Sequence, residues 1–287
     1  MSIDKLQRSI RKLKNPLMVA LSADFSQVPP QFRDGSDLSN CVRYTKFLLL
    51  ALKDTVPAVR FDFGSFSVLG SEGVESLSQL LQFANEQGYY VLLDAPEMFS
   101  PRQAELVANG IFTHWCFDGL LLSCYLGTDT LKPFTRYMKD NDKDLFIVLR
   151  TGNKSASEIQ DLLTGSRLVH TAAADLAKHL GESFIDRCGY SRIAGVGAAT
   201  SPNTLQNLRS KYPSLFLMAD SIDYSGANAK NCAEAFDKLG HGAIACVSSY
   251  VTGAWQDSDA RGEDPVRLAV QAAERLKKNI NRYVTIL

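Results

Sequence analysis

The sequence predicts a single α/β domain of the (β/α)8 TIM-barrel class. Eight short apolar runs rich in β-branched or aromatic residues alternate with longer segments of helical period, and the connections between them are short. The 287 residues fit one such barrel, and no linker or repeat divides the sequence, so we expect one domain over residues 1–287. The first predicted strand is not followed by the Gly-x-Gly-x-x-Gly motif of a doubly wound dinucleotide-binding sheet, which argues against that alternative.

The predicted strands are short, as is typical of parallel strands that are buried on both faces. They are Leu17–Leu21, Ala58–Phe63, Tyr89–Asp94, Gly119–Ser123, Leu145–Arg150, Ile193–Gly197, Leu215–Ala219 and Ala243–Val247. Helices are predicted near 38–53, 72–87, 101–109, 129–139, 156–180, 203–211, 227–239 and 264–281. Residues 1–14 are expected to form an additional helix that caps the barrel.

Several predicted helices begin after residues that commonly cap a helix N-terminus. Ser100 and Ser201 each precede a proline, which is favoured at the first position of a helix. Ser36, Ser71 and Thr128 stand at the start of three further helical patterns. These signals place helix starts shortly after strands, as a series of βα units requires.

Composition and charge exclude several classes of protein. The 31 basic and 31 acidic side chains cancel, so no basic field is available to attract nucleic acid or an anionic membrane. Apolar runs such as 47–52 are too short to cross a bilayer, and the N-terminus lacks the apolar core of a signal peptide. We therefore expect a cytoplasmic protein that binds neither nucleic acid nor membrane.

The cysteines and histidines give no sign of a metal site or a catalytic triad. The six cysteines form no Cys-x-x-Cys pair and show no zinc-site spacing, so we expect reduced thiols in a reducing compartment. The four histidines are scattered, and none stands in a pattern with a serine, cysteine or carboxylate that would suggest a triad. No metal and no cofactor are expected.

A block of ten residues after the fourth predicted strand, Tyr-Leu-Gly-Thr-Asp-Thr-Leu-Lys-Pro-Phe at 125–134, is the most specific motif of the chain. Further motifs are Asn15–Leu21, Leu149–Ser155, Gly189–Ser191, Gly195–Thr200, Gly242–Ile244 and Ser248–Ser249. In order and spacing, these segments resemble the long bacterial form of orotidine 5'-phosphate decarboxylase over nearly the whole chain. The resemblance implies the same barrel.

The family reaction replaces a carboxylate of orotidine monophosphate with a proton and needs neither metal nor cofactor. The resemblance implies that a fixed lysine supplies the proton, while aspartates hold the lysines and crowd the substrate carboxylate. Glycine amides and an arginine bind the phosphate, and this remote contact contributes to catalysis. It also implies a dimer across the barrel mouths, in which one aspartate of each site comes from the partner subunit.

The chain departs from the family at the catalytic end of the site. The family motif Asp-x-Lys-x-x-Asp corresponds to Asp94, Pro96 and Phe99, so only its first charged group is kept. The family's lysine on the second strand is Arg60, and its aspartate after the first strand is Ser22. Proline and phenylalanine have no proton to give, and a guanidinium with a pKa above ~12 is a poor proton donor.

The phosphate end departs separately. The family's Pro-Gly-x-Gly loop corresponds to Ala219–Gly226, where side chains replace the glycines and Asp220 and Asp223 would face a dianion. A like charge at ~4 Å costs on the order of 4 kcal/mol at an effective dielectric constant of ~20. The family's arginine after Ser-Ser corresponds to Tyr250, which follows Ser249 and can donate only one neutral hydrogen bond.

Two interpretations remain open for several of these residues. Asp94 is either a surviving catalytic carboxylate or, as we favour, a cap for the next loop. Arg60 either acts in catalysis or, as we favour, forms an ion pair with Asp62 or Asp94. Asp94, Asp220 and Asp223 form a weak candidate site for a divalent cation.

Two interpretations also remain open for the residues that match the nucleobase end of the family site. Arg150, Thr151 and Asn153 either recognise an amide-bearing ring or only preserve the shape of their loop. Tyr250 and Trp255 either stack on a ring ligand or fill the former pocket.

These departures favour a diverged paralogue with little or no decarboxylase activity, which acts as a binding or regulatory protein for a nucleotide-like small molecule. We expect a homodimer, or a heterodimer with a competent relative. One alternative is a genuine decarboxylase with a rearranged site, for which Lys132 and Lys154 are the nearby lysines. Another is an enzyme of a different class that uses the mouth carboxylates on a non-phosphorylated substrate.

Overall fold

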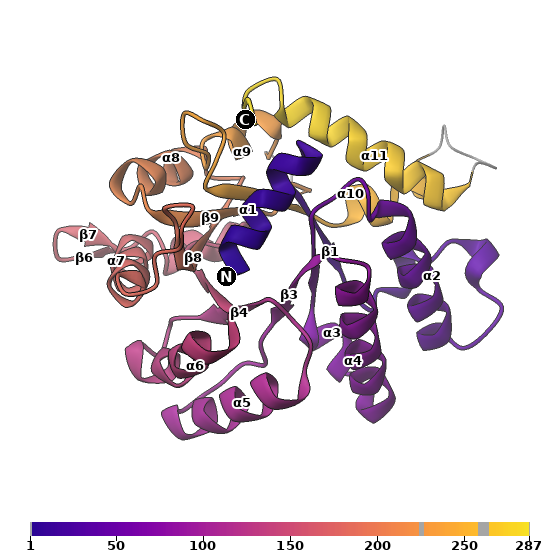
Figure 1. Ribbon diagram of the computed structural model, residues 1–287, viewed down its shortest axis with the longest axis horizontal. Helices are drawn as coiled ribbons and strands as arrows, with labels where there is room; N and C mark the ends of the chain where they lie inside the picture. The colour runs from indigo at the N-terminus through magenta and orange to yellow at the C-terminus, as the bar shows by residue number, and fades with distance from the viewer. Residues whose placement is uncertain (1, 224–226, 258–263, 287) are drawn as a thin grey trace.

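The computed structural model describes residues 2–223, 227–257 and 264–286, except for the side chain of Asp140. Eight parallel strands close into a barrel in the order β1-β10-β9-β8-β5-β4-β3-β2 (Figure 1). Helices surround this barrel between successive strands. The predicted (β/α)8 TIM-barrel fold is therefore confirmed.

All eight predicted strands are present, with small shifts at their ends. They are β1 (Leu17–Leu21), β2 (Ala58–Phe61), β3 (Tyr90–Asp94), β4 (Gly119–Ser123), β5 (Asp144–Val148), β8 (Ser191–Ala198), β9 (Leu215–Asp220) and β10 (Ala243–Val247). Most of their residues are buried, because the helices cover the outer face of the sheet and side chains fill its interior. Two very short strands, β6 (Leu163–Thr164) and β7 (Arg167–Leu168), form a separate antiparallel hairpin.

The helices of the described residues include several short ones near the strand ends. They are α1 (Ser2–Leu13), α2 (Asp37–Leu52), α3 (Phe63–Ser67), α4 (Gly70–Glu86), α5 (Pro101–His114), α6 (Thr128–Asn141), α7 (Val169–Gly181), α8 (Pro202–Lys211), α9 (Ala229–Ala233), α10 (Ser249–Thr252) and α11 (Pro265–Ile280). Short 3₁₀ turns are η1 (Phe25–Gln27), η2 (Pro30–Phe32), η3 (Lys154–Glu158) and η4 (Ala254–Gln256). No helix in the described ranges is long and apolar enough to cross a membrane.

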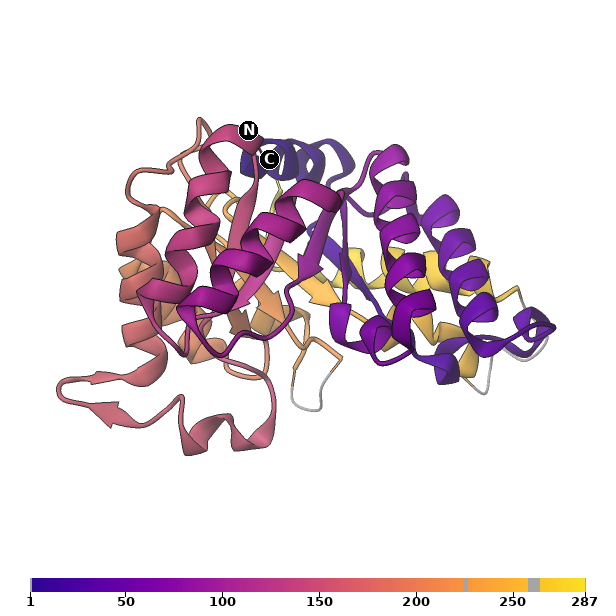
Figure 2. The same cartoon turned by 90° about the horizontal axis from the view of Figure 1, so that it is seen from below.

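The helix predicted over 156–180 is wrong in its first half. Ile159, Leu162 and Leu163 recur at helical spacing, but their side chains are exposed and face no core. The chain instead makes the β6–β7 hairpin, whose turn contains Gly165 at φ +64°. The hairpin extends from the barrel at the end opposite to α1 (Figure 2).

The helix predicted over 227–239 is also too long, because α9 ends at Ala233. Further along, the Asp237 carboxylate accepts hydrogen bonds from the backbone N–H groups of Leu239 and His241, both at 2.8 Å. Such local bonds offer the backbone an alternative to the helix. The second predicted strand ends early for a similar reason, since Asp62 caps α3 through the N–H groups of Gly64 and Ser65.

Helix α1 closes the end of the barrel where the strands begin (Figure 2). Its apolar side chains Ile3, Leu6 and Ile10 are fully buried. Lys5 forms an ion pair with Asp118, with 3.0 Å between nitrogen and oxygen. The opposite end, where the strands finish, is therefore the one at which βα connections can build a site.

A buried polar network lies at the closed end. Asp144 at the start of β5 is fully buried and accepts a hydrogen bond of 2.7 Å from the Tyr90 hydroxyl. Arg192 Nε lies 3.4 Å from the same carboxyl group and also donates to the carbonyls of Met138 and Lys143. Burial raises the pKa of Asp144 to about 7, although the hydrogen bond from Tyr90 and the charge of Arg192 lower it in part.

We expect Asp144 to make the protein less stable as the pH rises from about 4 to about 7. Between the ordinary pKa of 3.8 and the raised value of about 7, the folded state binds this proton and the unfolded state does not. The free energy of unfolding then falls by about 1.4 kcal/mol for each pH unit in this window. Urea denaturation at pH 5 and pH 7 checks this, and Asp144→Asn should flatten the slope. An unchanged slope in the variant would contradict the assignment.

Candidate functional site

The candidate site is an ion cluster at the open end of the barrel, which we call the mouth. Arg60 on β2 binds Asp94 at the end of β3 through two hydrogen bonds of 2.7 Å, from Nε to Oδ1 and from Nη2 to Oδ2. Its Nη1 lies 3.2 Å from Oδ1 of Asp220 at the end of β9. The three side chains meet because parallel strands bring their C-terminal ends to one face. Arg60 thus joins strands from two sides of the barrel.

The cluster partly confirms the expected pairing. The ion pair between Arg60 and Asp94 is present, whereas Asp62 caps α3 and contributes no ion pair to Arg60 among the described contacts. Asp94 was expected to cap the loop after β3, but both of its oxygens accept from Arg60. The participation of Asp220 was not predicted from the sequence.

The electrostatics of the cluster oppose proton donation by Arg60. Burial alone would lower the pKa of Arg60, but the charges of Asp94 and Asp220 raise it well above its usual value. Burial raises the pKa of Asp94, and the Arg60 charge and hydrogen bonds offset this in part. The Cys246 thiol lies 3.9 Å from Arg60, and burial raises its pKa well above the ordinary value. A neutral thiol and a permanently charged guanidinium are poor acids and bases.

Asp223 occupies the backbone amides that begin α10. Its carboxylate accepts hydrogen bonds from the N–H of Ser248 at 2.5 Å and from the N–H of Tyr250 at 2.9 Å. Burial raises the pKa of Asp223, and the two amide hydrogen bonds lower it in part. The rest of this loop, Tyr224 to Gly226, lies outside the described residues. Amides that could bind an external anion are therefore bound to a carboxylate of the chain itself.

The residues expected near the nucleobase belong to a second polar cluster in the β5–α7 connection. Arg150 forms an ion pair of 3.0 Å with Asp161, and His170 lies 3.2 Å from the same carboxylate. The hydrogen bonds of Arg150 lower the pKa of Asp161. In the described residues, no hydrogen bond or ion pair joins this cluster to Arg60.

Thr151 bonds to Asn153 and to a third residue that the sequence did not indicate. The Thr151 hydroxyl donates to the Asn153 side-chain oxygen at 2.6 Å, and the Thr151 N–H donates to Gln160 at 2.8 Å. The sequence did not indicate Gln160 and Asp161, because a helix was predicted where they form a turn, and it did not indicate His170, which lies in the first turn of α7. These contacts account for the loop shape without any ligand.

The remaining candidate residues stand around the rim. Ser22 lines a cavity of about 20 Å³ with Asp24 and Tyr44, which is large enough for about one water molecule. Ser249 and Tyr250 are exposed on α10. The Trp255 indole N–H donates to the Gln27 carbonyl at 2.8 Å, which fastens η4 to the loop after β1. This contact favours the interpretation that Trp255 fills the former pocket over the interpretation that it stacks on a ring ligand.

The mouth carboxylates do not form a cation site. Within residues 2–223, 227–257 and 264–286, no group of three or more His, Cys, Asp or Glu side chains is arranged to hold a metal ion. Asp94 and Asp220 bind Arg60, and Asp223 binds backbone amides, so their oxygens point to different partners. The divalent-cation interpretation finds no support in this geometry.

No family model matches the chain, but individual relatives cover nearly all of it. An orotidine 5'-phosphate decarboxylase of Rhodopirellula baltica is 27% identical over 295 residues, covering 95% of this chain and 98% of the relative. That of Clostridium kluyveri is 26% identical over 248 residues, covering 85% of this chain and 84% of the relative.

Solved structures show the same fold. Leishmania donovani OMP decarboxylase superposes with a TM-score of 0.74 at 24% identity, covering 99% of this chain and 98% of that chain. Plasmodium berghei orotidine 5'-monophosphate decarboxylase superposes with a TM-score of 0.79 at 13% identity, covering 98% and 99%. At these identities the likeness concerns the fold alone.

We expect Arg60→Gln to lower the free energy of unfolding by about 3 kcal/mol, because it leaves two largely buried carboxylates without their cation. Arg102→Gln is the control, since Arg102 is 77% exposed in its pair with Glu105, and exposed pairs contribute less than about 1 kcal/mol. Urea denaturation at pH 7 measures both variants. Equal effects of the two substitutions would show that the mouth cluster is no more important for stability than a surface pair.

Proposed function

We propose that this chain, which is similar in sequence to orotidine 5'-phosphate decarboxylases and shares their fold, is a diverged member of that family with little or no decarboxylase activity, acting as a binding or regulatory protein. The observation that carries this proposal is the closed ion cluster of Arg60, Asp94 and Asp220. Each of its charges already has a partner within the chain.

The catalytic end lacks a proton donor of the kind that the family reaction uses. The family lysine corresponds to Pro96, and the second aspartate corresponds to Phe99, whose side chain is 76% exposed. Arg60 carries one positive charge against the two negative charges of Asp94 and Asp220. A substrate carboxylate would therefore meet a net negative cluster and no transferable proton.

The phosphate end is occupied by the chain itself. A phosphate could reach the amides of Ser248 and Tyr250 only by displacing Asp223, which would leave that carboxylate without its hydrogen bonds beside a dianion. Both the lost bonds and the repulsion oppose this exchange. The ligand that suits this mouth is a nucleoside-like ring without a phosphate, either neutral or cationic.

A homodimer across the mouths is part of the proposal. Four large apolar side chains, Val68, Phe99, Tyr125 and Leu126, are 80%, 76%, 80% and 45% exposed. They stand on the connections that follow β2, β3 and β4, which are neighbours in the barrel. Exposed apolar groups gathered at one end of a protein commonly mark an interface. A heterodimer with a competent relative would use the same surface.

A second candidate function is an enzyme of another class that uses the mouth carboxylates on a non-phosphorylated substrate. The observation in its favour is that burial raises the pKa of Asp94 and of Asp223, as in many general acids and bases. A genuine decarboxylase finds less support, because Lys132 lies exposed on α6 and Lys154 lies exposed on η3.

The primary test is a turnover assay with orotidine 5'-monophosphate, paired with calorimetry. We expect no turnover above the uncatalysed reaction, because the described residues of the mouth offer no lysine and no free anion site. We also expect uridine to bind more tightly than uridine 5'-monophosphate, since the phosphate meets Asp220 and Asp223. Turnover would overturn the proposal, and tighter binding of the monophosphate would refute the argument about the phosphate end.

A double variant, Pro96→Lys with Phe99→Asp, separates the two ends of the site. It restores the family charges near Asp94 but leaves Asp223 on the amides, so we expect it to remain inactive. Recovery of full activity would show that only the catalytic end had been lost.

Sedimentation velocity tests the dimer. We expect the wild-type chain to sediment as a dimer, and Tyr125→Asp to raise the dissociation constant by at least about tenfold, because it places a charge in a desolvated contact. Leu239→Asp is the control, since Leu239 is 54% exposed and precedes β10 at the closed end of the barrel. A monomeric wild type, or equal effects of the two variants, would exclude a dimer across the mouths.

A further inference from the structure

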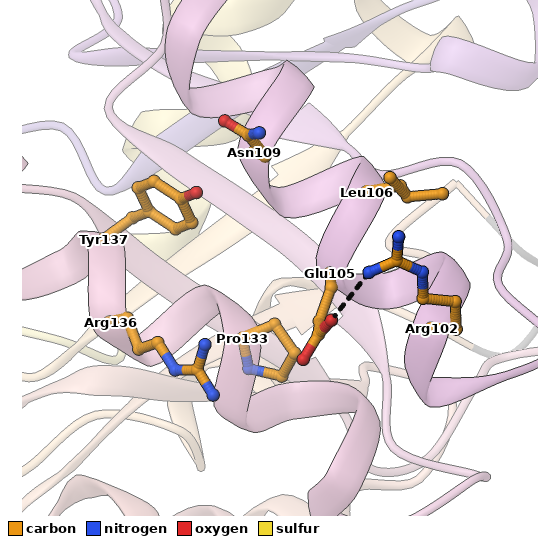
Figure 3. A pocket seen from close by; sticks show the side chains of 7 residues that line it. All are labelled: Arg102, Glu105, Leu106, Asn109, Pro133, Arg136 and Tyr137. Carbon is orange, nitrogen blue, oxygen red and sulfur yellow. Dashed lines mark hydrogen bonds and ion pairs between the residues drawn. The ribbon is translucent and has the colours of Figure 1, made fainter.

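A cavity of about 360 Å³ lies between α5 and α6, on the outside of the barrel. Figure 3 shows side chains of both helices around it, with the hydroxyl of Tyr137 directed toward the space between them. The lining residues are Arg102, Glu105, Leu106, Asn109, Pro133, Arg136 and Tyr137. The volume falls in the range of small-molecule sites, which begins at about 300 Å³.

The apolar part of the lining is centred on a stacked pair of aromatic rings. The Tyr137 ring stacks on Phe112 with 5.0 Å between centroids and 13° between planes. Pro133 is buried within α6, and Leu106 contributes a side chain that is 59% exposed. A flat apolar body can therefore lie against the Tyr137 ring and Pro133, which are already held in place, and this lowers the entropic cost of binding.

The polar part of the lining carries an unbalanced positive charge. Arg102 and Glu105 pair with each other, with 3.3 Å between nitrogen and oxygen. No hydrogen bond or ion pair within the described residues involves the guanidinium of Arg136, which is exposed at the edge of the cavity. A guanidinium presents a planar fork that matches a carboxylate. An anionic ligand in this cavity would therefore pair with the guanidinium of Arg136.

We propose that this cavity binds a small organic anion that carries a carboxylate on a planar apolar body. The carboxylate pairs with Arg136, and the apolar body lies against Leu106, Pro133 and the ring of Tyr137. The Asn109 amide and the Tyr137 hydroxyl supply further hydrogen bonds at the rim. The site uses none of the mouth residues, so the proposal is independent of what the mouth binds.

Calorimetry with 1-naphthoate as the probe tests the chemistry of the site. We expect one binding site per chain for the naphthoate and weaker binding of 1-naphthalenemethanol and 1-naphthylmethylamine, which keep the ring and change the charge. Inorganic phosphate at equal concentration should not displace the naphthoate, because phosphate lacks the apolar body. Equal binding of the three ring compounds, or displacement by phosphate, would overturn the proposal.

Substitutions on α5 and α6 test whether the naphthoate binds in this cavity. Arg136→Gln should weaken naphthoate binding about fivefold, the effect of one partly exposed charge pair. Glu105→Gln should strengthen it, because it removes a negative charge from the lining. Lys139→Gln is the matched control, since Lys139 is exposed one turn further along α6 and outside the lining. All three positions are exposed, so folding should be preserved, which circular dichroism verifies. Absence of binding, or equal loss in Arg136→Gln and Lys139→Gln, would refute the site.

Discussion

The ion cluster of Arg60, Asp94 and Asp220 constrains everything else at the mouth of this barrel. A guanidinium that reaches from β2 to both β3 and β9 must be balanced where it lies, because the surrounding strand ends are largely buried. Removing one partner of such a group costs far more than the complete cluster contributes to stability. The charges are therefore interdependent, and a change at any one of the three positions requires changes at the others.

The same internal pairing recurs around the rim. Asp223 takes the amides of Ser248 and Tyr250, and Gln160 bonds to Thr151. A catalytic site of the electrostatic kind keeps donors and charges aimed at the place where the substrate's charge will develop. Here the corresponding groups have partners within the chain, and a charged ligand would have to break these contacts before it could make its own.

The sequence predicted the barrel well because each strand is a short buried run and each unit repeats the same pattern. It predicted the region from 156 to 168 wrongly, because Ile159, Leu162 and Leu163 have helical spacing and yet face solvent. The pair of Arg60 and Asp94 was foreseen because adjacent strands bring them together. Asp220 stands 160 positions away from Arg60, and its approach depends on closure of the barrel. The bonds of Asp223 to two amides depend on the exact path of a loop, which no residue pattern specifies.

The closed end of the barrel explains how the mouth could change without loss of the fold. Helix α1 buries Ile3, Leu6 and Ile10 there, and Asp144 joins Tyr90 of β3 to Arg192 of β8 within the interior. These contacts tie strands together at the end opposite to the mouth and share no residue with the ion cluster. In such barrels the residues that carry chemistry stand where the strands finish, and the end where the strands begin contributes to stability without taking part in the site. Proline at position 96 and phenylalanine at position 99 therefore stand at an end of the barrel where residues can vary while the contacts of the closed end are kept.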